Sequence, residues 1–151
     1  MAAAAGYVEE EKERDGMTEG LTVIIADDDP VVRDLIADCV GELGLSVQKV
    51  STGSQVLKLL QDGLPSLIIL DVYMPGLNGL KVCSAIRATQ RWSSVPVLIV
   101  SAYGDRQTLA KSIEAGANDF VVKPFTVTVL IDKIRRLVDA SQEPASLAFP
   151  A

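Results

Sequence analysis

The residues best suited to chemistry in this sequence are acids, a hydroxyl and an amine that each directly follow a short apolar run. They are Asp27, Asp28 and Asp29 after "LTVIIA", Asp71 after "LIIL", Ser101 after "VLIV" and Lys123 after "DFVV". Neighbouring carboxylates raise one another's pKa and destabilise a fold. Either local geometry separates the three consecutive aspartates, or a cation belongs among them.

The apolar runs have the length and composition of β-strands. They cover residues 21–26, 46–50, 67–70, 97–100 and 119–122. Helical periodicity fills the intervals, as in the apolar steps from Val32 to Leu43, which Gly44 then ends. Runs 67–70 and 97–100 lack polar alternation, as expected of central strands covered on both faces. The alternation predicts an α/β fold with one five-stranded parallel sheet and right-handed crossovers.

Sheets of this kind bind ligands beyond the carboxyl ends of their strands. Asp29 precedes Pro30, so we interpret it as a helix N-cap with proline at the first helical position. Asp27, Asp28 and Asp71 then remain at the sheet edge. Oxygen-only ligands in an open site suit Mg²⁺, which keeps several of its waters.

Lys123 and Ser101 would lie across from the metal-bound carboxylate. A lysine and a hydroxyl in that position are suited to hold a phosphoryl group, because such chemistry depends mainly on positioning and charge neutralisation. Each residue also has an ordinary interpretation: Asp71 as a turn residue, Ser101 as a helix cap and Lys123 as a surface lysine. Their shared position at successive strand ends favours the functional interpretation.

These residues give the chain a resemblance to the receiver domain of bacterial two-component response regulators, typified by the chemotaxis receiver. The resemblance covers about Leu21 to Ala140 and is carried by "ADDDP", "LDVYMPGLNG", "VSAY" and "AGANDFVVKPF". Asp71 and Ser101 are 30 residues apart, and Ser101 and Lys123 are 22 apart, as in the family. The resemblance implies a doubly wound, flavodoxin-like (βα)5 fold with strand order 2-1-3-4-5.

The resemblance also implies a role for each residue at the strand ends. Asp71 would take a phosphoryl group from the phosphohistidine of a sensor histidine kinase or a histidine phosphotransfer protein, and Ser101 and Lys123 would contact its oxygens. Lys123–Pro124 matches the family's cis peptide bond. The protein would catalyse only its own phosphorylation and dephosphorylation, and would turn over no external metabolite.

The metal site that the resemblance implies holds Mg²⁺, with Mn²⁺ as a substitute. Asp28 would bind the ion directly and Asp27 through water. Asp71 and the main-chain carbonyl of Tyr73 would complete the protein ligands. Tyr73 and Tyr103 each follow a phosphoryl-contacting residue by two positions. We expect both rings at the mouth of the site, where they either shield the phosphoryl group or are merely half-exposed aromatics.

A conformational switch is the output that the resemblance implies. Ser101 would move toward the phosphoryl group, and Phe120 would turn into the vacated space, although Phe120 also fits a plain core position. The signalling face would comprise the helix around Leu109 and Ile113, the strand 119–122 and the last helix. A homodimer through this face is a further expectation.

Two other functions fit the fold class less well. An aspartate-nucleophile phosphohydrolase needs a second acid two residues after the nucleophile, where this chain has Tyr73. A flavin-binding domain of similar topology needs a Ser/Thr/Gly-rich phosphate loop after the first strand. This chain has "DDDP" there, which would repel phosphate.

The composition of the chain limits its possible ligands and its cellular compartment. The chain has 151 residues, is 48% hydrophobic and carries a net charge of −6, and its longest basic run is Arg135–Arg136. This argues against nucleic-acid binding through this chain. The absence of histidine excludes histidine triads and histidine metal ligands. Cys39 and Cys83 fall in helical patterns, so we expect core thiols in a reducing, cytoplasmic compartment. No apolar stretch is long enough for membrane insertion.

The expected domain organisation is simple. Residues 1–19 are charged and unpatterned and are expected to be a disordered N-terminal tail, residues 20–140 the receiver domain, and residues 141–151 a C-terminal tail or truncated linker. The flanking segments are too short for an output domain of ordinary size. The protein therefore either acts alone through protein contacts or continues into a longer chain.

Overall fold

The computed structural model describes residues 20–142. The expected N-terminal tail lies outside the described residues, as does the expected C-terminal tail from residue 143 onward. The last helix continues through Gln142, two residues beyond the expected end of the domain.

One sheet of five parallel strands forms the centre of the molecule, in the expected order β2-β1-β3-β4-β5. The strands are β1 (Thr22–Ala26), β2 (Ser46–Val50), β3 (Leu67–Leu70), β4 (Val97–Ser101) and β5 (Asp119–Val122). Every residue of β3 and β4 is buried, which confirms that these strands are covered on both faces. In the edge strand β2, the polar residues Ser46, Gln48 and Lys49 are exposed, and the two valines are partly buried.

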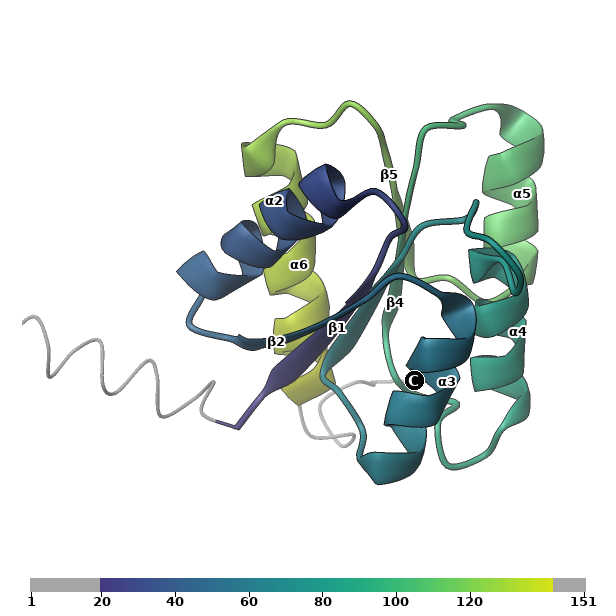
Figure 1. The fold of residues 1–151 in the computed structure, drawn as a ribbon, viewed down its shortest axis with the longest axis horizontal. Coiled ribbons are helices and arrows are strands. Elements are labelled where there is room, and N and C mark those ends of the chain that lie inside the picture. Colours follow the sequence, from purple (N-terminus) through teal and green to yellow (C-terminus); the bar gives the residue numbers. More distant parts are fainter. Residues whose placement is uncertain (1–19, 143–151) are drawn as a thin grey trace, which may run out of the picture.

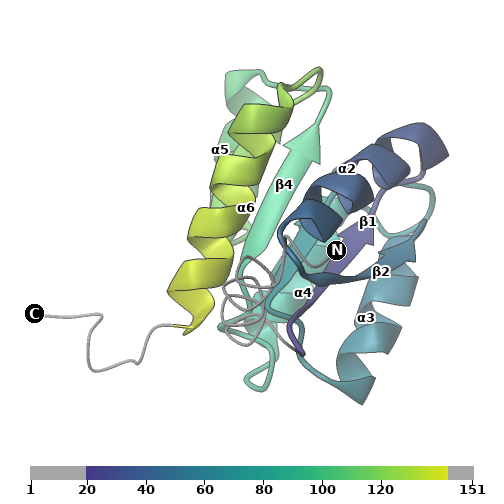
Figure 2. The ribbon, with the colours of Figure 1, turned by 90° about the vertical axis from the view of Figure 1, so that its left-hand side faces the viewer.

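Five helices cover the two faces of the sheet. They are α2 (Pro30–Glu42), α3 (Gly53–Asp62), α4 (Gly79–Ala88), α5 (Arg106–Glu114) and α6 (Val127–Gln142). Helices α2 and α6 lie on one face, and α3, α4 and α5 lie on the other (Figure 1, Figure 2). The side chains of β1 alternate accordingly: Val23 and Ile25 pack with α2 and α6, whereas Ile24 packs with α3 and α4. Two apolar cores therefore hold the sheet edge rigidly in place.

The starts of α2, α3, α4 and α5 are fixed by polar caps in the loops that follow the strands. Asp29 Oδ1 accepts a hydrogen bond of 2.9 Å from the Val31 amide, and Pro30 is the first residue of α2, as expected. A cap of this kind is worth about 1 kcal/mol. Asp105 caps α5, and Ser101 lies inside β4, so the interpretation of Ser101 as a helix cap is wrong. Asp29, the third of the three consecutive aspartates, therefore has a structural role as the cap of α2.

Two further expectations concern burial and membranes. Cys39 and Cys83 are buried free thiols in α2 and α4. Across residues 20–142, none of the helices has the length and apolar content needed to cross a bilayer.

Candidate functional site

Strand register brings the predicted residues to one edge of the sheet. Ala26 is paired with Leu70, and Ser101 with Val122, so the residues that follow β1, β3 and β5 emerge beside one another. The Asp71 amide donates to the Ala26 carbonyl at 2.9 Å, and the Lys123 amide donates to the Ser101 carbonyl at 2.8 Å. The main chain therefore fixes the starting point of each functional side chain.

An acidic cluster forms where β1 and β3 end. Carboxylate oxygens of Asp27, Asp28 and Asp71 lie within 4.8 Å of one another. Asp27 and Asp71 are buried, whereas Asp28 is exposed. Three carboxylates with one open side match the ligand chemistry of Mg²⁺, which binds a few carboxylates and retains water. Like charges at this spacing repel, so a divalent cation would relieve a cost that the fold otherwise bears.

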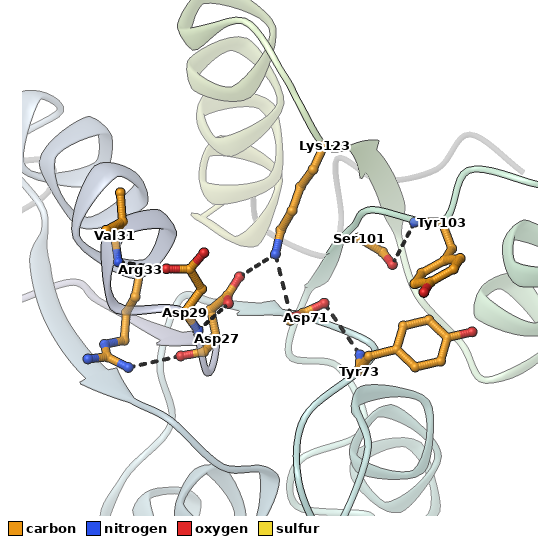
Figure 3. A network of polar contacts seen from close by, with 9 residues as sticks. All are labelled: Asp27, Asp29, Val31, Arg33, Asp71, Tyr73, Ser101, Tyr103 and Lys123. Atoms are coloured by element: carbon orange, nitrogen blue, oxygen red, sulfur yellow. Dashed lines mark hydrogen bonds and ion pairs between the residues drawn. The ribbon is translucent and has the colours of Figure 1, made fainter.

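Lys123 already supplies one positive charge to this cluster. Its Nζ lies 2.7 Å from Asp27 Oδ2 and 3.5 Å from Asp71 Oδ2 (Figure 3). Burial alone would lower the pKa of Lys123, but the hydrogen bond to Asp27 and the charges of Asp71 and Asp27 outweigh burial and raise the pKa. Lys123 is therefore a permanent cation at this edge. The expected cis peptide bond between Lys123 and Pro124 is present.

Asp71 is the acid whose protonation this environment changes most clearly. Burial and the charge of Asp27 raise the pKa of Asp71 to about 6, although Lys123 and the Tyr73 amide oppose the shift. The Tyr73 amide lies 3.4 Å from Asp71 Oδ1. The negative charge of Asp71 at neutral pH is therefore unfavourable in the folded protein. Binding of a cation or an electrophile at this carboxylate would relieve that cost.

Ser101 and two tyrosines lie on the side of Asp71 away from Asp27 (Figure 3). The Ser101 side chain is buried, and its Oγ accepts a hydrogen bond of 3.2 Å from the Tyr103 amide. The residues Tyr73 and Tyr103 are 53% and 55% exposed, and their rings were expected at the mouth of the site. Their ring centroids are 4.6 Å apart with the planes tilted by 59°. The positions of Tyr73 and Tyr103 two residues after Asp71 and Ser101 do not indicate that the rings touch.

Phe120 is partly buried and lies on the face of the sheet opposite to α6. It is partly buried against the core that includes Val97 and Ile99, and it lines a shallow groove beside Leu109 and Ile113. Leu109 and Ile113 are exposed on α5. Phe120 is therefore only partly covered by the core and borders exposed apolar side chains of α5.

Two contributors to the site were not identified from the sequence. Arg33 donates from a guanidinium nitrogen to the Asp27 carbonyl at 3.0 Å and so braces the loop after β1. Gly79, the first residue of α4, lies so close to the main chain of Asp71 that a Cβ would collide with the Asp71 carbonyl oxygen. The "NG" dipeptide at Asn78–Gly79 is a turn signal, but sequence alone does not show what approaches the glycine.

Comparisons with known proteins agree with this geometry. The response regulator receiver domain family matches residues 23–135. The chain is 32% identical to the DNA-binding response regulator MtrA of Mycolicibacterium smegmatis, over 83% of this chain and 54% of MtrA. It is 32% identical to the chemotaxis protein CheY of Pseudomonas aeruginosa, over 79% of this chain and 97% of CheY. The chain thus spans about half the length of MtrA.

Solved structures show the same likeness. A putative response regulator from Chloroflexus aurantiacus superposes with a TM-score of 0.76 at 29% identity, covering 79% of this chain and 98% of that one. The receiver domain of the sensor histidine kinase PA1611 from Pseudomonas aeruginosa gives a TM-score of 0.73 at 26% identity, covering 80% and 98%. That receiver was solved with a magnesium ion coordinated in its active site cleft.

Proposed function

This chain belongs to the response regulator receiver domain family, and we propose that its Asp71 accepts a phosphoryl group from the phosphohistidine of a sensor histidine kinase or a histidine phosphotransfer protein. The observation that carries the proposal is the convergence of charges on one carboxylate. Asp27 and Asp28 lie within 4.8 Å of Asp71, and Lys123 bridges the Asp27 and Asp71 carboxylates, 3.5 Å from that of Asp71. This arrangement can hold one metal ion and one phosphoryl group.

Asp71 is the nucleophile in this proposal. One carboxylate oxygen forms a bond to phosphorus as the bond between phosphorus and the donor nitrogen breaks, and the electron pair of that bond leaves with the imidazole. Lys123 would turn from Asp27, 2.7 Å away, toward a phosphoryl oxygen. The Ser101 hydroxyl would donate a hydrogen bond to another. Such fixed charges and donors lower the barrier because they need little reorganisation during the reaction.

The metal ligands would be Asp27, Asp28, Asp71 and the main-chain carbonyl of Tyr73. Bound Mg²⁺, with Mn²⁺ as a substitute, would neutralise charge on the phosphoryl oxygens. The magnesium ion in the PA1611 receiver supports this assignment by likeness. A phosphohydrolase would need an acid at position 73, and the half-exposed Tyr73 supplies none.

The output would be a change at the face formed by α5, β5 and α6. Ser101 would shift toward the phosphoryl group, and Phe120 would turn inward to fill the vacated space. Exposed apolar side chains at Leu109, Ile113 and Val122 support a partner or a second copy of the chain at this face. Phosphorylation would act by shifting the population between two packings.

The cellular setting completes the proposal. We place the protein in the cytoplasm, where buried thiols such as Cys39 and Cys83 remain reduced. MtrA is described as DNA-binding, but this chain spans about half of MtrA. With a net charge of −6 and no basic run longer than two residues, this chain itself is not expected to bind DNA.

The test is incubation with acetyl phosphate and Mg²⁺, followed by measurement of the intact mass. We expect one phosphoryl adduct on the wild type and none on Asp71→Asn. Asp29→Asn is the matched control, because Asp29 belongs to the same acidic run but caps α2, and asparagine caps helices equally well. It should take up phosphoryl like the wild type. An adduct that persists on Asp71→Asn would refute the assignment.

A further inference from the structure

Arg33 contacts both ends of the turn that carries the acids after β1. Its main-chain amide donates to the Asp29 carbonyl at 2.9 Å and so makes the first hydrogen bond within α2. Its guanidinium turns back and donates from Nη1 to the Asp27 carbonyl at 3.0 Å. Arg33 is partly buried, and Figure 3 shows that it reaches Asp27 from the α2 side, away from Lys123. One residue of α2 therefore spans the turn Asp27–Asp29.

Asp28 lies in the middle of this turn and is the exposed acid of the cluster. The peptide group before Asp28 contains the Asp27 carbonyl, which Arg33 holds. The peptide group after Asp28 contains the Asp29 amide, which donates to Asp27 Oδ1 at 2.9 Å. Because both flanking peptide groups are held, the main chain fixes the direction in which the Asp28 side chain leaves the turn.

The position of Asp27 has further support that does not depend on Arg33. The Asp27 amide donates to the Val50 carbonyl at 3.3 Å, and Asp27 Oδ2 accepts from Lys123 Nζ at 2.7 Å. Without the Arg33 side chain, Asp27 would keep these contacts. The peptide group that leads into Asp28 would lose the hydrogen bond to its carbonyl. The effect of Arg33 therefore falls mainly on Asp28.

We propose that Arg33 is a positioning residue for Mg²⁺: it holds the turn so that Asp28 is oriented toward the ion before the ion binds, and it thereby tightens Mg²⁺ binding. This inference rests on the proposed metal site. A residue that orients a metal ligand through a hydrogen bond changes affinity without touching the metal. Without Arg33, the main chain at Asp28 would be ordered only on binding, and that loss of conformational entropy would lower affinity.

The charge of Arg33 gives the opposite expectation. The guanidinium is always protonated, and a cation near the site repels Mg²⁺. If Arg33 acted through its charge alone, removing it would tighten Mg²⁺ binding. If Arg33 acts by holding the turn, removing it weakens Mg²⁺ binding. The sign of the change therefore separates the two effects.

The experiment is a calorimetric titration of the chelator-treated full chain with MgCl₂. Arg33→Met keeps a long side chain but removes the charge and the hydrogen-bond donors. Arg33→Lys keeps the charge but lacks the planar guanidinium. Lys49→Met is the matched control, because Lys49 is a cation near the end of β2 that pairs with Asp34 at 3.0 Å and lies outside the turn.

We expect Arg33→Met to raise the Mg²⁺ dissociation constant by about tenfold, which corresponds to about 1.4 kcal/mol. Arg33→Lys should bind Mg²⁺ more tightly than Arg33→Met, because an ammonium group can still donate to the Asp27 carbonyl. Lys49→Met should bind Mg²⁺ as tightly as the wild type or slightly more tightly, because it removes a cation and leaves the turn intact.

Hydrogen exchange in the metal-free protein gives an independent readout. The amides of Asp28 and Asp29 should exchange faster in Arg33→Met than in the wild type, whereas exchange in α4, on the other face of the sheet, should be the same in both. Saturating Mg²⁺ should reduce the difference at Asp28 and Asp29, because the bound ion then holds the turn.

Three results would overturn the role of Arg33. They are Mg²⁺ binding by Arg33→Met that is equal to or tighter than that of the wild type, an equal loss of affinity in Lys49→Met, and unchanged exchange at Asp28 and Asp29. A wild type that binds no Mg²⁺ would instead overturn the metal site of the proposed function, so the two failures are distinguishable.

Discussion

Replacing Asp71 by asparagine should stabilise the metal-free protein at neutral pH. Asp71 is buried and lies beside the carboxylate of Asp27, and Lys123 is shared between the two acids at 2.7 Å and 3.5 Å. Ionising Asp71 in the folded state is therefore unfavourable compared with ionising it in the unfolded chain. Asparagine keeps the shape and removes the charge.

The magnitude follows from the raised pKa of Asp71. Its folded pKa is about 6, against 3.8 for the unperturbed group. At about 1.4 kcal/mol for each pKa unit, ionised Asp71 lowers the free energy of unfolding by about 3 kcal/mol. This value already includes the attraction of Lys123, which opposes the rise in pKa, so we expect neutral asparagine to add about 3 kcal/mol to the free energy of unfolding at pH 7.5.

The pH dependence has a definite sign. The folded protein holds the Asp71 proton more tightly than the unfolded chain does. The contribution of Asp71 to stability therefore falls as the pH rises from about 4 to about 6, and stays low above that range. Asp71→Asn lacks this fall, so the gap between variant and wild type should open across the same window.

Urea unfolding followed by far-ultraviolet circular dichroism, in chelator-treated samples between pH 4 and pH 7.5, measures this gap. Asp29→Asn is the control, because Asp29 caps α2 and is not one of the three clustered acids; its curve should run parallel to that of the wild type. Equal stability of Asp71→Asn and wild type at pH 7.5, with parallel curves below it, would refute the electrostatic reasoning.

Three further predictions concern the metal, the backbone around Asp71 and the switch. Mg²⁺ at a hundredfold excess over its dissociation constant should add about 2.7 kcal/mol to the free energy of unfolding, and Asp28→Ala should lose most of this gain in urea titrations. Gly79→Ala should slow phosphoryl uptake because its Cβ displaces the Asp71 carbonyl, whereas Gly41→Ala in α2, which has open space, should not; equal uptake by both variants would contradict this. Beryllofluoride with Mg²⁺ should change hydrogen exchange in α5, β5 and α6, and changes confined to α2 and α3 would argue against the proposed switch.

Much of the fold could be predicted because local patterns determine it. The apolar runs of central strands such as 67–70 are continuous, and their ends are marked by polar residues, so the predicted bounds agree with β3. Strand ends in a parallel sheet necessarily share an edge, and this placed Asp71 and Lys123 together. The cap at Asp29 was predictable because an acid before proline is a local signal.

The remaining features depend on contacts between distant segments. Helical periodicity identified α5, but it could not show that Leu109 and Ile113 lie outside the core, at 40% and 65% exposure. An exposed apolar face of a helix has the same periodicity as a face that packs against the sheet. The approach of Gly79 to Asp71 and the contact of Tyr73 with Tyr103 arise from how loops fold against one another, and no local pattern encodes them.

The most direct test of the account is to locate the phosphoryl group in the chain. Protein treated with acetyl phosphate and Mg²⁺ is reduced with borohydride, which converts an aspartyl phosphate to homoserine, and its peptides are then sequenced by mass spectrometry. If Asp71 is the phosphoacceptor, homoserine appears at position 71 in the wild type, and none appears in a sample prepared without a phosphoryl donor. Homoserine at position 27 or 28 with intact aspartate at position 71 would contradict it.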